Sequence, residues 1–232
     1  MKKLVILTGA GISAESGIAT FRGGNGLWDG HRIEDVCTPQ ALQKNRRQVI
    51  EFYNERRKEI SDKQPNAAHL NLKILEERYD VQIITQNIDD FHERAGSKNV
   101  LHLHGEIRKL CSSFDVSQTV LMEGWEQKLD DLHEDGSLLR PFIVFFHENV
   151  PMIEFAEKLA VTADIFVVIG TSLQVYPAAA LLQYVRSSVP IYVIDPQIPE
   201  ITHLLKNPLH IIQKPATQGT AELLNCLMEN AL

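Results

Sequence analysis

The feature that most constrains the fold is an apolar run near the N-terminus that leads straight into a glycine turn. Leu4-Val5-Ile6-Leu7 predicts a buried β-strand, and residues 9–14 follow with the pattern G-x-G-x-x-A. Glycines at these places let the backbone approach a pyrophosphate, and the N-terminus of the helix that follows favours its negative charge. We therefore predict a strand, a turn and a helix that hold a pyrophosphate, with a plain strand-to-helix turn as the alternative.

The continuation of this unit is unusual for a dehydrogenase. Such enzymes place a second strand with an acidic end about 20 residues further on. Here residues 17–26 form a glycine-rich loop instead. The sequence therefore does not indicate a simple dehydrogenase.

Two further apolar stretches end in polar residues that suit a ligand. Val81–Ile84 predicts a buried strand, and polar side chains follow it within residues 86–89. Residues 100–103 alternate as a second strand does and deliver His104 beside Gly105, which leaves the ring accessible. Because α/β enzymes keep their chemistry at such strand ends, we interpret His104 as functional, although a lone histidine is more often structural.

The alternation of predicted strands and helices indicates an α/β fold with a doubly wound parallel sheet. The 232 residues allow one domain that carries a second, smaller inserted lobe. Ile165–Ile169 is apolar throughout, as a central parallel strand is, and residues 39–61 predict helices. Another strand is predicted to end at Asp195, which either binds a ribose hydroxyl or makes a turn before Pro196.

Charge and hydropathy exclude several classes of function. The net charge of -7 argues against a nucleic-acid surface, which needs an excess of basic residues. No apolar run approaches the roughly 18 residues of a membrane helix, and the short run before Thr8 is a strand rather than a signal peptide. Cys37, Cys111 and Cys226 stand far apart and predict no disulfide framework. We expect a cytoplasmic protein without nucleic-acid or membrane partners.

Four motifs, in the same order along the chain, resemble those of the sirtuin family, the NAD-dependent protein deacylases. The resemblance runs nearly end to end. The motifs are Gly9-Ala10-Gly11-Ile12-Ser13 with Gly17-Ile18 and Phe21-Arg22-Gly23, then Thr85-Gln86-Asn87-Ile88-Asp89 with His92-Glu93-Arg94-Ala95-Gly96, then His102-Leu103-His104-Gly105, and last Gly170-Thr171-Ser172.

This resemblance implies two lobes with the active cleft between them. The large, Rossmann-like lobe that binds NAD would gather residues 1–22, 62–104 and 141–232. The small lobe would gather residues 23–61 and 105–140.

The resemblance also implies roles for the polar strand ends. NAD would be consumed as a co-substrate, with His104 as general base on a ribose hydroxyl, because the usual pKa of imidazole lies near working pH. Asn87, the second catalytic residue, and Asp89 would hold the nicotinamide amide. Gln86 would contact the ribose, and Phe21 would shield the reacting centre from water. The residues expected to bind NAD are Gly9, Ala10, Gly11, Ser13, Glu15, Ala19, Phe21, Arg22, Gln86, Asn87, Ile88, Asp89, Gly170, Thr171, Ser172, Asp195 and Ala216.

Two residues on a predicted helix suggest which acyl group is removed. Tyr53 and Arg56 lie three apart and so share one face, where a hydroxyl and a guanidinium suit a carboxylate. They resemble the Tyr-x-x-Arg of sirtuins that remove acidic acyl groups, which implies desuccinylation or demalonylation alongside deacetylation. The alternative is a solvated Arg56, with Tyr53 filling a helix interface. Sirtuins that remove acidic acyl groups usually have alanine at the position of Cys37, so we expect the thiol to narrow the pocket for the acyl group slightly.

A second segment, residues 140–148, resembles the strand with which the family holds its substrate. His147 replaces the usual glycine, and its side chain either narrows the groove or points to solvent. The residues expected to contact the substrate are Tyr53, Arg56, Val144, Phe145, Phe146 and Glu148.

Residues 105–140 depart from the family pattern. Most sirtuins place two Cys-x-x-Cys pairs here for a structural zinc, whereas this segment contains only Cys111, with His133 as the nearest second candidate. Structural zinc takes four ligands, so we expect no metal. We predict instead a small lobe held by apolar contacts among Phe114, Val116, Val120, Leu121, Trp125 and Leu129.

Together the motifs imply an NAD-dependent protein-lysine deacylase that yields nicotinamide, deacylated lysine and O-acyl-ADP-ribose. Its partner would be acylated lysine on protein substrates, and we expect a monomer. Two alternatives stay open. One is an NAD glycohydrolase or ADP-ribosyltransferase on the same scaffold, and the other is a catalytically silent sensor of NAD or ADP-ribose.

Overall fold

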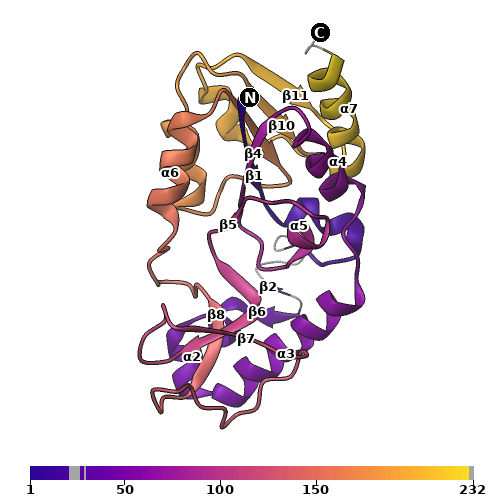
Figure 1. The fold of residues 1–232 in the computed structure, drawn as a ribbon. Helices are drawn as coiled ribbons and strands as arrows, with labels where there is room; N and C mark the ends of the chain where they lie inside the picture. Colours follow the sequence, from indigo (N-terminus) through magenta and orange to yellow (C-terminus); the bar gives the residue numbers. More distant parts are fainter. Residues whose placement is uncertain (21–26, 29, 230–232) are drawn as a thin grey trace.

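The protein has two lobes, one built on a six-stranded parallel sheet and one on helices and a small antiparallel sheet (Figure 1). The computed structural model describes residues 1–20, 27–28 and 30–229. The predicted α/β fold with a second, smaller lobe is thus confirmed. No helix in these ranges is long and apolar enough to cross a membrane.

The large sheet has the strand order β11-β10-β9-β1-β4-β5, and its neighbouring strands are parallel. Strand β1 lies in the middle, so the chain builds the sheet outward on both sides of it. This order creates a switch point between β1 and β9, where an open α/β sheet binds ligands. The strands are β1 Lys3–Thr8, β4 Asp80–Thr85, β5 Val100–His102, β9 Ile165–Ile169, β10 Ile191–Ile194 and β11 Leu209–Ile212.

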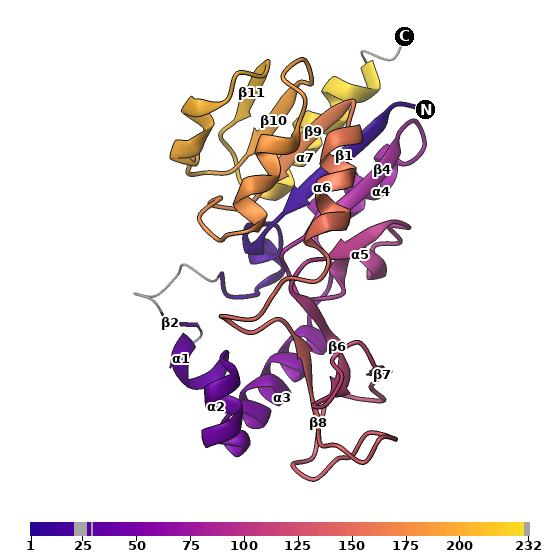
Figure 2. The same ribbon diagram turned by 90° about the vertical axis from the view of Figure 1, so that its left-hand side faces the viewer.

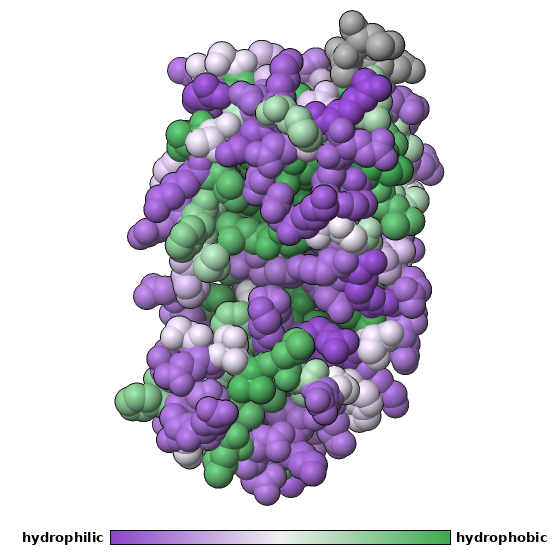
Figure 3. Space-filling view, in the orientation of Figure 1, coloured by the Kyte–Doolittle hydropathy of each residue, from purple (hydrophilic) through white to green (hydrophobic). Residues whose placement is uncertain are grey.

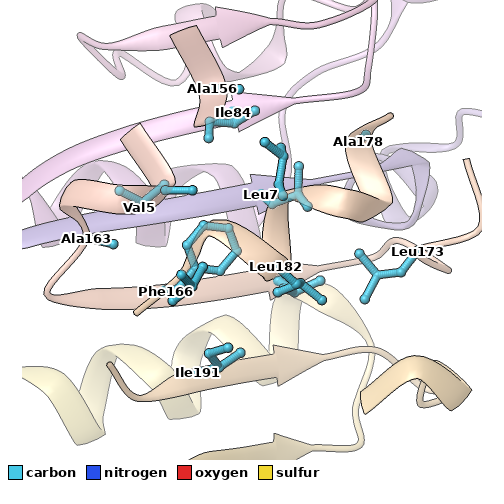
Figure 4. Close-up of a cluster of buried hydrophobic side chains, with 14 of the residues drawn as sticks. Val5, Leu7, Ile84, Ala156, Ala163, Phe166, Leu173, Ala178, Leu182 and Ile191 are labelled. Carbon is cyan, nitrogen blue, oxygen red and sulfur yellow. The ribbon is translucent and has the colours of Figure 1, made fainter. Parts of the chain in front are cut away.

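Helices cover both faces of this sheet, which is why its central strands are apolar on both sides (Figures 1 and 2). On one face α4 (Ala67–Leu75) and α7 (Ala216–Glu229) pack against each other and the sheet. On the other face lie α6 (Ile153–Thr162) and the 3₁₀-helix η3 (Ala178–Tyr184). Figure 4 shows Phe166 of β9 in this second core, among small side chains of the covering helices.

The segment after β1 differs from the prediction. An α-helix was expected after Gly9, but the chain forms two short 3₁₀-helices, η1 (Ala10–Ile12) and η2 (Ala14–Ser16). Gly17, at a φ of 85°, ends the second of them. Gly9 and Gly11 hydrogen-bond to the backbone of Ile169 and Gly170, so the chain stays against the end of β9 here.

The small lobe combines helices with a sheet of order β7-β6-β8. The predicted helices over residues 39–61 are confirmed. The strands of this sheet are antiparallel, and a two-stranded ribbon, β2 with β3, precedes the helices. The elements are β2 Leu27–Trp28, β3 His31–Arg32, α1 Ile33–Val36, α2 Pro39–Lys44, α3 Arg46–Asp62, β6 Gly105–Ser112, β7 Thr119–Leu121 and β8 Leu139–Ile143. The short helices α5 (Phe91–Arg94) and η4 (Glu200–Leu204) complete the described elements.

The predicted apolar core of residues 105–140 is wrong. Phe114 is 88% exposed in the loop before β7. Leu121 is 67% exposed, because β7 is an edge strand with its residues turned to solvent. Val116, Val120 and Trp125 are exposed as well, and Leu129 is only half-buried. Apolar atoms accordingly gather on the surface of the lower lobe in Figure 3. The buried apolar cluster consists of Leu110, Met122 and Leu139.

A buried polar network holds this segment to α3 instead. The guanidinium of Arg57 is buried and donates to the carbonyl of Ile107 (2.9 Å) and to the side chain of Asn54 (2.6 Å). Asn54 also accepts from the backbone N–H of Gln127 (2.9 Å). The buried side chain of Gln127 donates to the carbonyl of Leu139 (2.7 Å). These bonds connect α3 to β6, β8 and the loop between them.

The residues of this lobe do not fit a structural zinc. Cys111 is buried, with its thiol 3.8 Å from the carbonyl of Pro141, and burial raises its pKa to about 11. A structural zinc takes four ligands, and Cys111 is the one cysteine of this segment. Over the described residues no group of three or more metal-ligating side chains occurs.

We expect Arg57→Met to lower the free energy of unfolding by about 2–4 kcal/mol, because it leaves buried carbonyl and amide groups without their donor. Arg47→Met is the matched control on the same helix, where the side chain is 70% exposed and should cost less than about 0.5 kcal/mol. Urea unfolding of the full chain, with and without a metal chelator, measures both. Equal costs for the two variants, or a loss of stability in chelator, would contradict this account.

Candidate active site

The loops after β1 and β9 touch backbone to backbone. Gly9 donates its N–H to the carbonyl of Ile169 (3.0 Å), and Gly11 donates to the carbonyl of Gly170 (2.9 Å). A Cβ on Gly11 would lie 2.6 Å from the Cα of Gly170, and one on Gly9 would lie 2.7 Å from the Cβ of Thr171. No larger residue fits, so the glycines of the first and fourth motifs form one surface at the switch point of the sheet.

The end of β4 binds to this surface through Asn87. Its side-chain amide donates to the carbonyl of Gly9 (3.2 Å) and to the hydroxyl of Ser13 (3.2 Å). Ser13 in turn donates to a carboxylate oxygen of Asp89 (3.0 Å). All three polar side chains are buried. The structure therefore joins residues that the first two motifs place 76 positions apart.

Asp89 is a buried carboxylate with few compensating bonds. Its second oxygen accepts the backbone N–H of Phe91 (3.2 Å) at the start of α5. Burial raises its pKa from 3.8 to about 6, although the bonds from Phe91 and Ser13 and the charge of His102 oppose the rise. Near neutral pH Asp89 is therefore a carboxylate that is easily protonated.

A second bond closes the same edge of the sheet. The side-chain amide of Gln86 donates to the hydroxyl of Thr171 (2.9 Å), which links the ends of β4 and β9. Thr171 is buried and Ser172 is half-buried. Residues from the first, second and fourth motifs thus meet at one place.

His104 follows β5, and its ring is bonded to Gln86, the residue before Asn87. Its Nδ1 lies 2.9 Å from the carbonyl oxygen of Gln86, which can only accept, so Nδ1 carries the proton of the neutral ring. In the described part of the chain Nε2 makes no hydrogen bond, and its lone pair is available. Burial lowers the pKa of His104 from 6.5, with the bond to Gln86 acting against it. The ring is therefore a neutral base at pH 7.

His102, two residues earlier, is bound at both nitrogens. Its Nδ1 lies 3.0 Å from the carbonyl of Asn87, and its Nε2 lies 2.8 Å from a carboxylate oxygen of Glu93. The bond and charge of Glu93 raise the pKa of His102 against its burial. Sequence analysis did not single out this pair as functional, since only the fold brings α5 beside β5.

The other residues expected to bind NAD have differing surroundings in the part of the chain that the structure describes. Glu15 accepts from the backbone N–H (2.8 Å) and the hydroxyl (2.6 Å) of Thr217, at the start of α7. Asp195 accepts the N–H of Gln197 (2.8 Å), a bond that belongs to the turn around Pro196. Phe21 and Arg22 lie outside the described residues. Ala10 is half-buried, Ala19 is exposed, Ile88 is partly buried in the core that contains Tyr53, and Ala216 is buried.

Most of the residues expected to contact the substrate are held by contacts inside the protein, and Phe146 lies at the surface. Tyr53 is fully buried, donates its hydroxyl to the thiol of Cys37 (3.3 Å) and stacks on buried Phe145 at 6.0 Å between ring centroids. Glu148 holds the guanidinium of Arg140 through two bonds (2.6 and 2.9 Å). Phe146 is 36% exposed.

The remaining residues of this segment support its position next to His104. Val144 donates its backbone N–H to the carbonyl of His104 (3.0 Å). His147 is exposed and has a φ of 72°, the left-handed conformation that glycine adopts without strain. The glycine that the resemblance leads us to expect here would adopt this conformation without strain, and the exposed side chain of His147 points to solvent.

A family model described as the Sir2 family matches residues 9–177. The chain belongs to the Sir2 family. The resemblance to sirtuins seen in the four motifs is thus confirmed.

Two Sir2 relatives show how far the similarity extends. An NAD-dependent protein deacylase of Aggregatibacter actinomycetemcomitans is 58% identical over 192 residues, which cover 83% of this chain and 92% of the relative. A protein of the same name from Bacteroides thetaiotaomicron is 49% identical over 233 residues, which cover 98% of this chain and 99% of the relative.

Solved Sir2 structures share the whole fold. A Sir2 homologue variant with ADP-ribose has a TM-score of 0.90 at 36% identity. A variant with 2′-O-acetyl ADP-ribose has a TM-score of 0.87 at 37% identity, and a Sir2 protein with a p53 peptide and NAD+ has 0.79 at 32%. Each comparison covers 99% of this chain and 93% of the other.

The raised pKa of Asp89 predicts how stability depends on pH. A group whose pKa is higher in the folded state stabilises the fold below its unfolded value and loses that contribution as the pH rises through the folded value. The window therefore runs from pH 3.8 to above 6, and the rise to about 6 corresponds to about 3 kcal/mol. We expect Asp89→Asn to gain about 2–3 kcal/mol relative to the wild type between pH 4 and pH 7. Urea unfolding without ligand measures this, and a constant difference across the range would refute it.

Proposed function

We propose that the chain is an NAD-dependent protein-lysine deacylase that yields nicotinamide, deacylated lysine and O-acyl-ADP-ribose. The observation that carries the proposal is the meeting of Ser13, Asn87 and Asp89 beside His104, whose Nε2 lone pair is open. The names of the relatives, and the ADP-ribose, acetyl ADP-ribose and peptide seen in related structures, support the same activity. When bound, NAD would supply the anomeric carbon that bonds the acyl oxygen as nicotinamide leaves, and the ribose hydroxyl that carries the acyl group in O-acyl-ADP-ribose.

The donor set fits NAD at the switch point. The glycine surface of Gly9, Gly11 and Gly170 offers backbone without side chains, which suits the close approach of a pyrophosphate. Asn87 and Asp89 present an amide and a carboxylate, which together match the donor and acceptor of a nicotinamide carboxamide. We place the nicotinamide there and the ribose beside Gln86.

His104 would move one proton. Its Nε2 takes the proton from a ribose hydroxyl, while Nδ1–H stays bonded to the carbonyl of Gln86 and keeps the tautomer fixed. The lowered pKa ensures that Nε2 is unprotonated at pH 7. The carbonyl of Gln86 therefore orients the base as well as holding the strand end.

We expect His104→Ala to lower kcat/KM about a hundredfold or more and to leave NAD affinity within about threefold, because the base acts after binding. The wild type should also lose activity on the acid side with a midpoint below pH 6.5, since protonated His104 cannot accept a proton. Mass spectrometry of an acetyl-lysine peptide with NAD gives the rate, and calorimetry gives the affinity. His203→Ala, at an exposed site, is the control.

Near-normal turnover in His104→Ala would contradict the assignment of His104 as the general base. The assay also separates the alternatives, because nicotinamide release that continues without peptide indicates a glycohydrolase, and no release at all indicates a sensor.

We also propose that acidic acyl groups are removed alongside acetyl. Arg56 has a side chain only 14% exposed, pairs with Glu59 at 3.0 Å and lies over the ring of Phe52, in the lobe that borders the cleft. A succinyl carboxylate would compete with Glu59 for the guanidinium. It would also compete with the thiol of Cys37 for the hydroxyl of Tyr53, which limits the gain.

Arg56→Met tests this choice of acyl group. Bonds to charged groups contribute roughly 1.5–3 kcal/mol, so we expect catalytic efficiency on a succinyl-lysine peptide to fall about tenfold to a hundredfold. Efficiency on the acetyl version of the same peptide should change less than about threefold. Arg47→Met, on the exposed side of the same helix, should alter neither. An equal fall on both peptides would show that Arg56 does not recognise the carboxylate.

A further inference from the structure

Two fully buried histidines lie behind the strand ends that carry Asn87. His69 belongs to α4 and His92 to α5, and their ring centroids are 5.0 Å apart at 64°. Buried polar rings of this kind cost more than apolar side chains of equal size unless they make hydrogen bonds. The chemistry described above uses neither ring, so their bonds need an explanation.

The bonds of Thr8 fix the tautomer of His92. The hydroxyl of Thr8 donates its single proton to the hydroxyl oxygen of Thr85 (2.9 Å). Thr8 also lies 3.0 Å from Nε2 of His92, so its oxygen must accept there and Nε2 must carry the proton. Burial and the neighbouring His69 and His102 lower the pKa of His92 far below its usual value, so the ring is neutral.

From Thr85 the path reaches Asn87 in one more step. The hydroxyl oxygen of Thr85 accepts the backbone N–H of Asn87 (3.1 Å). Thr8 and Thr85 are partners in the parallel pair of β1 and β4, which is why their hydroxyls meet. Consecutive hydrogen bonds thus run from the imidazole of His92 through both threonines to the residue that would face nicotinamide.

His69 supports this arrangement from behind. Its Nδ1 accepts the backbone N–H of Asn66 (3.2 Å) at the start of α4, so its proton is on Nε2. Among the described residues, Nε2 of His69 and Nδ1 of His92 have no hydrogen-bond partner. One is a donor and the other an acceptor, on rings that touch. The tautomer of His69 is thus compatible with the one that Thr8 requires of His92.

We propose that His92 is a positioning residue for the nicotinamide site. It donates to Thr8, Thr8 donates to Thr85, and the oxygen of Thr85 accepts the backbone N–H of Asn87, so the ring helps to hold both threonines where this last bond forms. This inference rests on the proposed function, since it assumes that Asn87 contacts nicotinamide. His92 touches neither substrate in this account and acts only through the threonines.

The test compares His92→Phe, which keeps an aromatic ring, although a larger one, and removes the donor, with His92→Gln, whose amide can donate in the same place. We expect His92→Phe to raise the inhibition constant for nicotinamide about tenfold, the loss given by one hydrogen bond, and His92→Gln to stay within about threefold of the wild type. Thr202→Val, at a buried threonine hydroxyl in η4, is the control for a general effect of packing. Thr8→Val breaks the middle link at equal volume and should match His92→Phe, which keeps the test decisive if His92→Phe does not fold.

Asn87→Ala separates failure of this inference from failure of the proposed function. If Asn87→Ala leaves nicotinamide inhibition unchanged, the nicotinamide site itself is misplaced. If Asn87→Ala weakens inhibition but His92→Phe and Thr8→Val only lower the melting temperature, the positioning role is overturned. When the role is correct, His92→Phe has no further effect on nicotinamide inhibition in the Asn87→Ala background, because both changes remove the same interaction.

Discussion

The backbone contact between the loops that follow β1 and β9 determines the rest of the site. It exists because Gly11 and Gly170 have no Cβ, so the two chains can approach until their amides bond. The contact fixes the carbonyl of Gly9, which receives the amide of Asn87, and the hydroxyl of Thr171, which receives the amide of Gln86. Three distant motifs are assembled around a contact between glycines.

The sheet and its polar edge could be predicted because their causes are local. Parallel strands covered on both faces appear as short apolar runs, and Val81–Ile84 and Ile165–Ile169 are such runs. The carboxyl ends of these strands meet at one edge by topology, so the polar residues after each were expected together. The helix after Gly9 was not predictable in this way, because its geometry depends on contact with β9, which lies over 150 residues further along the chain.

The contacts of the small lobe could not be predicted because they run against the local sequence pattern. In the lobe a charged residue, Arg57, is buried while Phe114 is exposed, and Asn54 bonds to Gln127, 73 residues away. Helical spacing placed Tyr53 on one face with Arg56. It could not show that the hydroxyl of Tyr53 bonds to the thiol of Cys37, which lies in the connection between α1 and α2.

The surroundings of His102 and His104 explain why the proposed mechanism assigns the base to His104. Both ring nitrogens of His102 are hydrogen-bonded, so neither has an open lone pair that could accept a proton from a ligand. Glu93 also raises the pKa of His102, which favours the protonated ring. His104 is bound at one nitrogen, and its pKa is lowered. The charge of His102 also lowers the pKa of Asp89, so His102 partly offsets the burial of that carboxylate. In the proposed mechanism the two histidines therefore differ in role because of their hydrogen-bond partners, Glu93 for His102 and the carbonyl of Gln86 for His104.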